Sequence, residues 1–181
     1  LDEWKDFLRR YKNPKGHVRI GLVGKYVELK DSYKSIAEAL DHAGALLETH
    51  VDVDWIHSEQ LHPDNVQAKL EGLHGILVAP GFGSRGIDGK LLAIQHAREQ
   101  RVPFFGICLG MQCAVVEFAR NVLGLSEAHS TEIKEYTPDP VIDLMGEQKS
   151  IKNMGGTMRL GEYPCDLKDG SEASKAYRHV A

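Results

Sequence analysis

Hydrophobic and polar positions change their spacing repeatedly along the first 122 residues, and these changes mark strands and helices. Four short apolar runs have the length and composition of strands, at residues 18–23, 51–57, 74–81 and 102–108. A segment with helical spacing or composition follows each run, at residues 32–50, 63–73, 91–100 and 109–122. Ser32 is a candidate N-cap for the first of these helices. This order predicts an α/β fold, a mostly parallel open sheet with helices on both faces.

The first residues of the chain lie outside this alternation. Leu1, Trp4 and Tyr11 stand at helical spacing, and the sequence KNPKG then ends the pattern. We therefore assign residues 1–16 to a linker helix and residues 17–181 to a single domain.

The pattern also loosens after Gly124, where turn residues surround one apolar island at residues 141–145. Residues 155–165 alternate again, which predicts a smaller antiparallel element near the C-terminus. Because the chain starts at Leu1 and stops without a closing element, we expect it to be part of a longer protein, truncated at the C-terminal end of this domain.

Composition narrows the class of protein. The 181 residues are 42% hydrophobic and 27% charged with a net charge of −4, which suits one globular domain and gives no basic surface for nucleic acid. Three cysteines without a CxxC pair favour a reducing compartment over a disulfide framework. No apolar run is long enough to span a membrane. We expect a cytoplasmic protein, and we assign it no metal site.

The candidate chemistry lies in the sequence GICLG, residues 106–110. A strand that ends in Gly-x-Cys-x-Gly and turns into a helix resembles a nucleophile elbow, with Cys108 as the nucleophile. Gly106 and Gly110 lack side chains where strand and helix would otherwise collide, and they permit a strained backbone between them. A helix N-terminus also favours a thiolate, the form of cysteine that attacks carbonyl carbons.

An oxyanion hole is expected beside this elbow. The N–H of Leu109, directly after Cys108, is placed to stabilise an oxyanion, and the second donor must come from a neighbouring loop. The glycine-rich turn at residues 81–83 is the natural source, because ligands in parallel sheets lie at the carboxyl ends of the strands. The alternative is that Cys108 is a small buried hydrophobe, the role we assign to Cys113 and Cys165.

Several motifs resemble one known family. GICLGMQ after a strand, with APGFG upstream, resembles the class I, triad-type glutamine amidotransferases. More narrowly, GLVGKYVELKDSYKSIAEAL, GFGSRGIDGK, PFFGICLGMQCAVVEFARNVLGL, STE and MGGTMRLGEYPC are similar to the glutaminase domain of the CTP synthase family. The resemblance covers residues from about 18 to 177, and residues 1–16 match the segment that joins this domain to the amidoligase domain there.

The resemblance implies a reaction. Cys108 would attack the side-chain amide of L-glutamine, form a glutamyl thioester and release ammonia. The ammonia would pass to an N-terminal amidoligase domain of the same polypeptide, which uses ATP to convert UTP to CTP. For the full-length enzyme the resemblance also implies Mg, GTP as an activator and a homotetramer.

The resemblance assigns residues as well. Gly81 and Leu109 would supply the oxyanion-hole amides. Phe82 would pack on the glutamine chain, and Gln112 and Glu132 would hold its amino-acid end. The glutamine-binding set that it implies is Gly81, Phe82, Leu109, Gly110, Met111, Gln112 and Glu132. Without the resemblance, Glu132 would be taken for a solvated loop carboxylate.

Arg85 and Gly86 fall in the segment that resembles the family's lid loop, which is linked to activation by GTP. A basic residue in a glycine-rich turn is suited to contact phosphate or a partner domain. The alternative is an ordinary surface loop.

The chain departs from the family at one point. The His-Pro-Glu sequence that completes the family's triad does not occur in the 181 residues. We therefore expect the catalytic histidine to lie beyond Ala181, so that this chain carries the nucleophile without its base. His57, two residues before Glu59, and His129 are weaker local substitutes.

Two other functions stay open at this point. The chain resembles, less closely, the glutamine amidotransferases of guanine, anthranilate and carbamoyl phosphate synthesis, from which GGTMRLG and GFGSRGIDGK separate it. A non-catalytic α/β regulatory domain with a structural cysteine is the alternative from another class.

Overall fold

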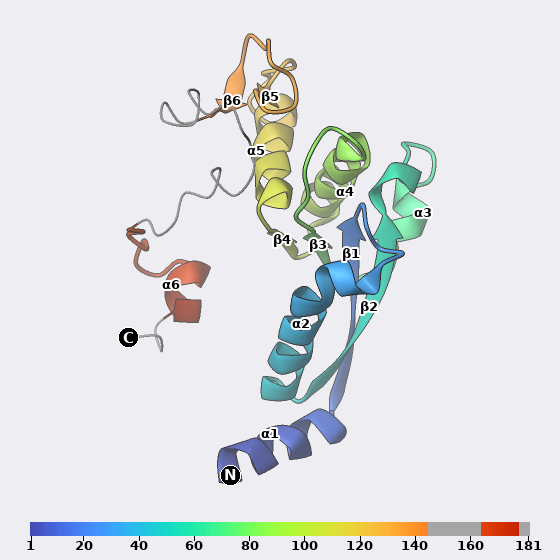
Figure 1. Ribbon diagram of the computed structural model, residues 1–181, viewed down its shortest axis with the longest axis vertical. Coiled ribbons are helices and arrows are strands. Elements are labelled where there is room, and N and C mark those ends of the chain that lie inside the picture. The colour runs from blue at the N-terminus through green and yellow to red at the C-terminus, as the bar shows by residue number, and fades with distance from the viewer. Residues whose placement is uncertain (145–163, 178–181) are drawn as a thin grey trace. The chain divides into compact units, whose positions relative to one another are not determined.

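The computed structural model of this protein describes residues 1–144 and 164–177 (Figure 1). The chain divides into two compact units, Leu1–Asp143 and Leu144–Ala181. The first unit includes the N-terminal helix α1 (Asp2–Lys12), which packs against the helix α2 (Lys34–Leu46). The predicted helix at the start of the chain is therefore confirmed, while the domain boundary at residue 16 stays a prediction.

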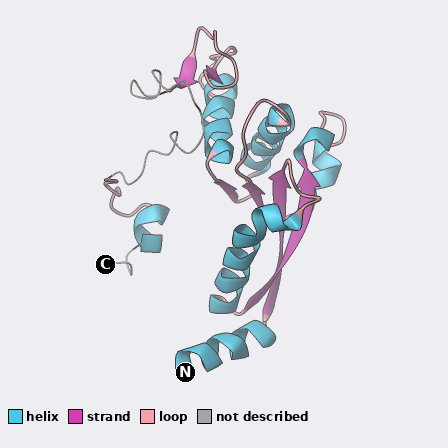
Figure 2. Cartoon of the chain, in the orientation of Figure 1, coloured by secondary structure: helices cyan, strands magenta, loops and turns pink. Residues whose placement is uncertain are grey.

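Four parallel strands form the sheet of the first unit (Figure 2). They are β1 (Gly16–Gly24), β2 (Thr49–His57), β3 (Gly75–Val78) and β4 (Phe104–Gly106). Their order across the sheet is β2-β1-β3-β4, and the register places Leu22 of β1 between Trp55 and Leu77. The predicted parallel sheet is confirmed, and the glycine-rich loop and the cysteine turn follow the neighbouring strands β3 and β4.

A helix follows each strand, as the alternation predicts. Besides α2, these are α3 (Val66–Leu70), α4 (Ile87–Gln100) and α5 (Leu109–Asn121). Two single 3-10 turns, Lys30–Tyr33 and Ser58–Gln60, precede α2 and α3. Of the helices that the structure describes, none is long and apolar enough to cross a membrane.

Successive side chains of a strand point to opposite faces of the sheet. Both faces of this sheet carry apolar side chains, and helices cover both. On one face, Leu22 and Leu77 pack with Tyr33 and with Ile36 of α2. On the other face, the strands pack against α4 and α5 through a larger cluster that includes Val23, Ile76, Val78, Ala93, Ile94, Leu109 and Cys113.

The predicted starts of two helices are wrong. Ser32 does not cap α2, because it lies inside the 3-10 turn that runs directly into the helix, and Tyr33 occupies the N-cap position. Helix α4 begins at Ile87, four residues before the predicted start at residue 91. Gly86 stands before it in a left-handed conformation with φ of 72°, so the glycines of this segment belong partly to the helix and its cap.

The fourth strand is shorter and more exposed than its apolar sequence suggests. Among the described residues, β4 is an edge strand of three residues, paired only with β3. Phe105 is 63% exposed although it belongs to the apolar run at residues 102–108, because an edge strand is covered by a neighbouring strand on one side only.

A small second sheet lies in the first unit, after α5. Its strands β5 (His129–Ser130) and β6 (Pro140–Ile142) are parallel, and β6 begins just before the predicted apolar island. The antiparallel element predicted at residues 155–165 lies outside the described residues, except for its last two. The described part of the second unit contains the short helix α6 (Glu172–Tyr177), which the sequence pattern did not predict.

A buried ion pair joins α4 to α5. Glu117 is 2% exposed, and its carboxylate accepts hydrogen bonds from Arg98 Nε at 3.0 and 3.1 Å and from Arg98 Nη2 at 2.8 Å. Asn121 Nδ2 donates to the same carboxylate at 3.0 Å. A buried charge is stable only when it is paired and hydrogen-bonded, so this contact fixes the spacing of the two helices.

Removing Arg98 and removing Glu117 should have different effects on stability, because each leaves a different charge without its partner. Arg98→Met leaves a buried carboxylate without its cation, and we expect it to lower the free energy of unfolding by about 3 kcal/mol. Glu117→Gln leaves a guanidinium that is 33% exposed, and we expect a loss of about 1 kcal/mol. Urea unfolding of both variants measures the difference, and equal losses would contradict this account.

Candidate active site

Cys108 joins β4 to α5 in a backbone conformation that cysteine rarely adopts. Its φ is 52° and its ψ is −111°, and it occupies the N-cap position of α5. Such a conformation costs about 1–3 kcal/mol and persists only where the surroundings impose it. The residue is exposed. The strained elbow predicted from the sequence is confirmed as a backbone feature.

The glycines on either side of Cys108 are required by contact between strand and helix. A Cβ atom on Gly110 would lie 2.0 Å from the carbonyl oxygen of Val78 at the end of β3. A Cβ atom on Gly106 would lie 2.7 Å from the backbone of Gly110 and Met111. Both positions therefore exclude any side chain, for the reason that the sequence pattern suggested.

The loop after β3 lies against this elbow. The N–H of Ile107 donates to the Val78 carbonyl at 3.1 Å, which ties the residue before Cys108 to the end of β3. A Cβ atom on Gly81 would lie 3.7 Å from Leu109 Cδ2. The structure thus brings together Gly81 and Leu109, the two residues whose N–H groups are expected to form the oxyanion hole.

Two buried lysines hold the carbonyl groups of this loop, and sequence reasoning missed both. Lys25, directly after β1, is 2% exposed, and Lys90 of α4 is fully buried. Lys25 Nζ donates to the carbonyl oxygens of Phe82 and Gly83, the latter at 2.8 Å. Lys90 Nζ donates to Ala79 O at 2.6 Å.

The sequence carried a signal for Lys90. The buried face of α4 includes Ile87, Lys90, Ala93, Ile94 and Ala97, which are spaced at three and four residues. A lysine in the middle of the apolar side of a helix is a candidate buried cation, and a buried cation needs hydrogen-bond acceptors.

Burial changes the proton affinity of groups around the elbow. It lowers the pKa of Lys90 to about 8, and it also lowers the pKa of Lys25, to which the neighbouring charge of Arg85 contributes. Burial raises the pKa of the Cys113 thiol to about 11. Cys113 is therefore a protonated core residue at neutral pH, as the sequence interpretation proposed.

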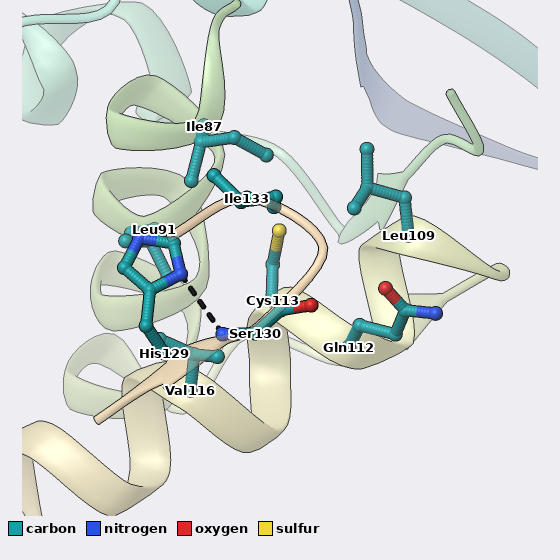
Figure 3. A pocket seen from close by; sticks show the side chains of 9 residues that line it. All are labelled: Ile87, Leu91, Leu109, Gln112, Cys113, Val116, His129, Ser130 and Ile133. Carbon is teal, nitrogen blue, oxygen red and sulfur yellow. Dashed lines mark hydrogen bonds between the residues drawn. The ribbon is translucent and has the colours of Figure 1, made fainter. Parts of the chain in front are cut away.

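Figure 3 shows the packing around Cys113. A small apolar cavity of about 10 Å³ lies among side chains of α4, α5 and the segment after them, lined by Ile87, Leu91, Leu109, Gln112, Cys113, Val116, His129, Ser130 and Ile133. A void of this size holds one water molecule at most, so it is a packing defect and not a substrate pocket.

The predicted glutamine-binding residues lie at and beside the elbow. Met111 and Phe82 are 49% and 80% exposed, so both present apolar surface to solvent. Gln112 lies in the first turn of α5, and its buried Oε1 has no hydrogen-bond partner among the described residues. Glu132 is exposed in the turn after Ser130 and lies within electrostatic range of Lys25, whose charge it favours. The individual roles of these residues stay predictions.

Arg85 and Gly86 lie in the loop before α4. The Arg85 Nε is 3.0 Å from Glu59 Oε1, and its guanidinium lies 5.8 Å from the centre of the Tyr26 ring. Gly86 packs closely on Ser58, because a Cβ atom there would lie 2.3 Å from Ser58 Oγ. The loop is therefore docked on the turn that follows β2.

The order of the strands places His57 far from Cys108. His57 ends β2, one edge of the described sheet, and Cys108 follows β4 at the other edge, three strand spacings or about 14 Å away. His57 Nδ1 accepts the Glu59 N–H, and its Nε2 lies 3.8 Å from Glu28 Oε1.

His129 lies beside Cys113 rather than at the elbow (Figure 3). Its Nδ1 accepts the Ser130 N–H at 2.9 Å, and burial, with help from Arg120 and Lys134, lowers its pKa. Within the described residues, no group of three His, Cys, Asp or Glu side chains is arranged to hold a metal ion.

Comparison with known proteins defines the class of this protein. Residues 28–180 match the family model described as glutamine amidotransferase class-I. The chain belongs to the class I glutamine amidotransferase family.

The relatives to which this chain is most similar among those compared include CTP synthases from several bacteria. The chain is 60% identical over 177 residues to the CTP synthase of Cytophaga hutchinsonii and 58% identical to that of Flavobacterium johnsoniae, covering 98% of this chain and 33% of each relative. It is also similar to the solved glutaminase domain of Trypanosoma brucei CTPS with bound acivicin, at a TM-score of 0.67 and 41% identity over 71% of this chain and 50% of that one. The chain thus corresponds to the glutaminase domain and spans about a third of the length of these CTP synthases.

The contact at Gly110 allows a direct test of the elbow. Replacing glycine by alanine inside a helix normally stabilises it by about 1 kcal/mol. At Gly110 the added methyl group would meet the Val78 carbonyl, and we expect Gly110→Ala to lower the free energy of unfolding by more than about 2 kcal/mol. Urea unfolding measures this loss, and an unchanged or raised stability would show that the contact is not tight.

Proposed function

We propose that this domain hydrolyses L-glutamine to glutamate and ammonia through a thioester at Cys108. The observation that carries the proposal is the positive-φ backbone of Cys108 between two glycines that exclude side chains, with the Gly81 loop against the helix that follows. This arrangement exposes a cysteine at a helix N-terminus, and the backbone N–H groups of Gly81 and Leu109 would serve it as the oxyanion hole of a nucleophile elbow.

The proposed reaction has two stages. The Cys108 thiolate attacks the side-chain carboxamide carbon, and the N–H groups of Gly81 and Leu109 stabilise the resulting oxyanion. The C–N bond then breaks, and the nitrogen leaves as ammonia after accepting a proton. Water hydrolyses the glutamyl thioester, which releases glutamate and regenerates the thiolate. The proton is carried by a histidine, which we place in a His-Pro-Glu sequence outside these 181 residues.

The substrate contacts follow from the chemistry of glutamine. The Glu132 carboxylate is suited to the α-ammonium group. The Gln112 side chain, whose Oε1 finds no partner in the part of the chain that the structure describes, is suited to the same end of the substrate. Exposed apolar surface at Phe82 and Met111 is available for the methylene groups of glutamine. Gly110 would contact the substrate through its backbone alone, because no side chain fits at this position.

At the level of the whole protein, we propose a CTP synthase. Ammonia from this domain would serve an N-terminal amidoligase domain of the same polypeptide, which uses ATP and Mg to aminate UTP. GTP would activate the enzyme through the loop that carries Arg85 and Gly86, and the full-length enzyme would be a homotetramer. The similarity to CTP synthases at 56–60% identity across nearly the whole chain supports this choice over other glutamine amidotransferases.

Labelling with acivicin tests the proposed nucleophile. Acivicin has an electrophilic ring and an α-amino acid group like that of glutamine, so we expect it to form one adduct, at Cys108. Peptide mass spectrometry of the full-length polypeptide locates the adduct, which should disappear in Cys108→Ala and persist in Cys113→Ala and Cys165→Ala. Excess L-glutamine should slow the labelling. Equal labelling of all three cysteines, or labelling of none, would refute the proposed function.

A further inference from the structure

The buried lysine of α4 has no part in the reaction described above. We propose that Lys90 is a positioning residue for the glutaminase reaction, because its ammonium holds the loop that carries Gly81 against the nucleophile elbow. This inference rests on the proposed function and deepens it, since it concerns the same site.

The geometry of the loop supports this role. Gly81 lies two residues after Ala79, whose carbonyl accepts the hydrogen bond from Lys90 Nζ at 2.6 Å. A Cβ atom placed on Gly81 would lie 3.7 Å from Lys90 Nζ and also 3.7 Å from Leu109 Cδ2. Lys90 therefore contacts the loop at the point where the loop lies against Leu109, the first residue of α5.

The backbone of the loop is held at both ends. Lys25 donates to the carbonyls of Phe82 and Gly83, after Gly81, while Lys90 donates to Ala79, before it. A chain fixed on both sides of one residue has little freedom to rotate the peptide N–H of that residue. Because displacements near 1 Å reduce rates by about 100-fold, this restraint matters for an oxyanion donor.

Burying the charged ammonium of Lys90 costs free energy, which indicates that this charge has a function. The ammonium is fully buried, and burial lowers its pKa to about 8. The charged groups that act on it are Lys25, which disfavours its charge, and the thiols Cys113 and Cys108, whose anionic forms would favour it. A methionine would fill the same volume without this penalty, so packing alone does not explain a lysine here.

The pH dependence follows from these facts. As pH rises through about 8, Lys90 loses its proton, its hydrogen bond to Ala79 loses its charge, and glutaminase activity should fall. Stability should move in the opposite direction. Between about 8 and the unfolded value of 10.5, the unfolded state binds a proton at Lys90 that the native state has released, so this group makes unfolding less favourable as pH rises. Deprotonation of Lys90 therefore lowers activity without itself favouring unfolding, and urea unfolding at pH 7.5 and pH 9 separates loss of activity from loss of stability.

The test compares Lys90→Met with wild type in the full-length polypeptide, with Glu117→Gln as the control. Glu117→Gln alters a buried charge between α4 and α5 away from the loop and should keep kcat within twofold of wild type. We expect Lys90→Met to lower kcat for glutamine hydrolysis at pH 7.5 by at least tenfold, on the order expected for a displaced oxyanion donor, with KM changed less than threefold. Its kcat should also lack the decline above pH 8 that deprotonation of Lys90 causes in wild type.

The outcomes separate this inference from the proposed function. If Lys90→Met loses less than tenfold in kcat, or keeps the alkaline decline of wild type, Lys90 does not position the loop. If Lys90→Met does not fold, Lys90→Gln, which keeps a donor that does not titrate, should lack the alkaline decline of wild type, and a retained decline would overturn the inference. If wild type neither hydrolyses glutamine nor takes up acivicin at Cys108, the proposed function fails and this inference fails with it.

Discussion

The close approach of α5 to the end of β3 is the contact on which the rest of the site depends. The backbone of Gly110 touches the Val78 carbonyl with no room for a methyl group between them. This contact sets where α5 begins, and the start of α5 sets the backbone of Cys108 and the direction of the first free N–H groups of the helix. The site is therefore defined by backbone packing before any side chain takes part.

Two buried cations then restrain the loop after β3, next to this backbone contact. Lys25 and Lys90 come from different elements, one after β1 and one in α4, yet both donate to carbonyl groups of the loop after β3. A glycine-rich loop has few side chains of its own to hold it, so the restraint must come from its neighbours. The cost of burying two ammonium groups is offset in part by three carbonyl acceptors, and the result is a loop of fixed shape next to the cysteine turn.

Much of this arrangement could be predicted from the sequence, because it depends on local patterns. Apolar runs and helical spacing gave the parallel sheet, and Gly-Ile-Cys-Leu-Gly gave the elbow, since glycine spacing encodes a backbone contact directly. The missed features depend on partners distant in sequence. The acceptor of Lys90 lies eleven residues away in another element, and the exposure of Phe105 follows from the place of β4 in the sheet. The start of α4 could not be predicted correctly, because glycine is common both in loops and at helix caps.

The strained backbone at Cys108 has an evolutionary consequence. Glycine would occupy a φ of 52° without the penalty that a side chain brings, so selection for stability alone would favour glycine at this position. Under the proposed function, a cysteine persists there because its sulfur is under selection. A gene copy released from that selection should drift toward glycine at this codon first, because that substitution would remove the proposed nucleophile and relieve the backbone strain in one step.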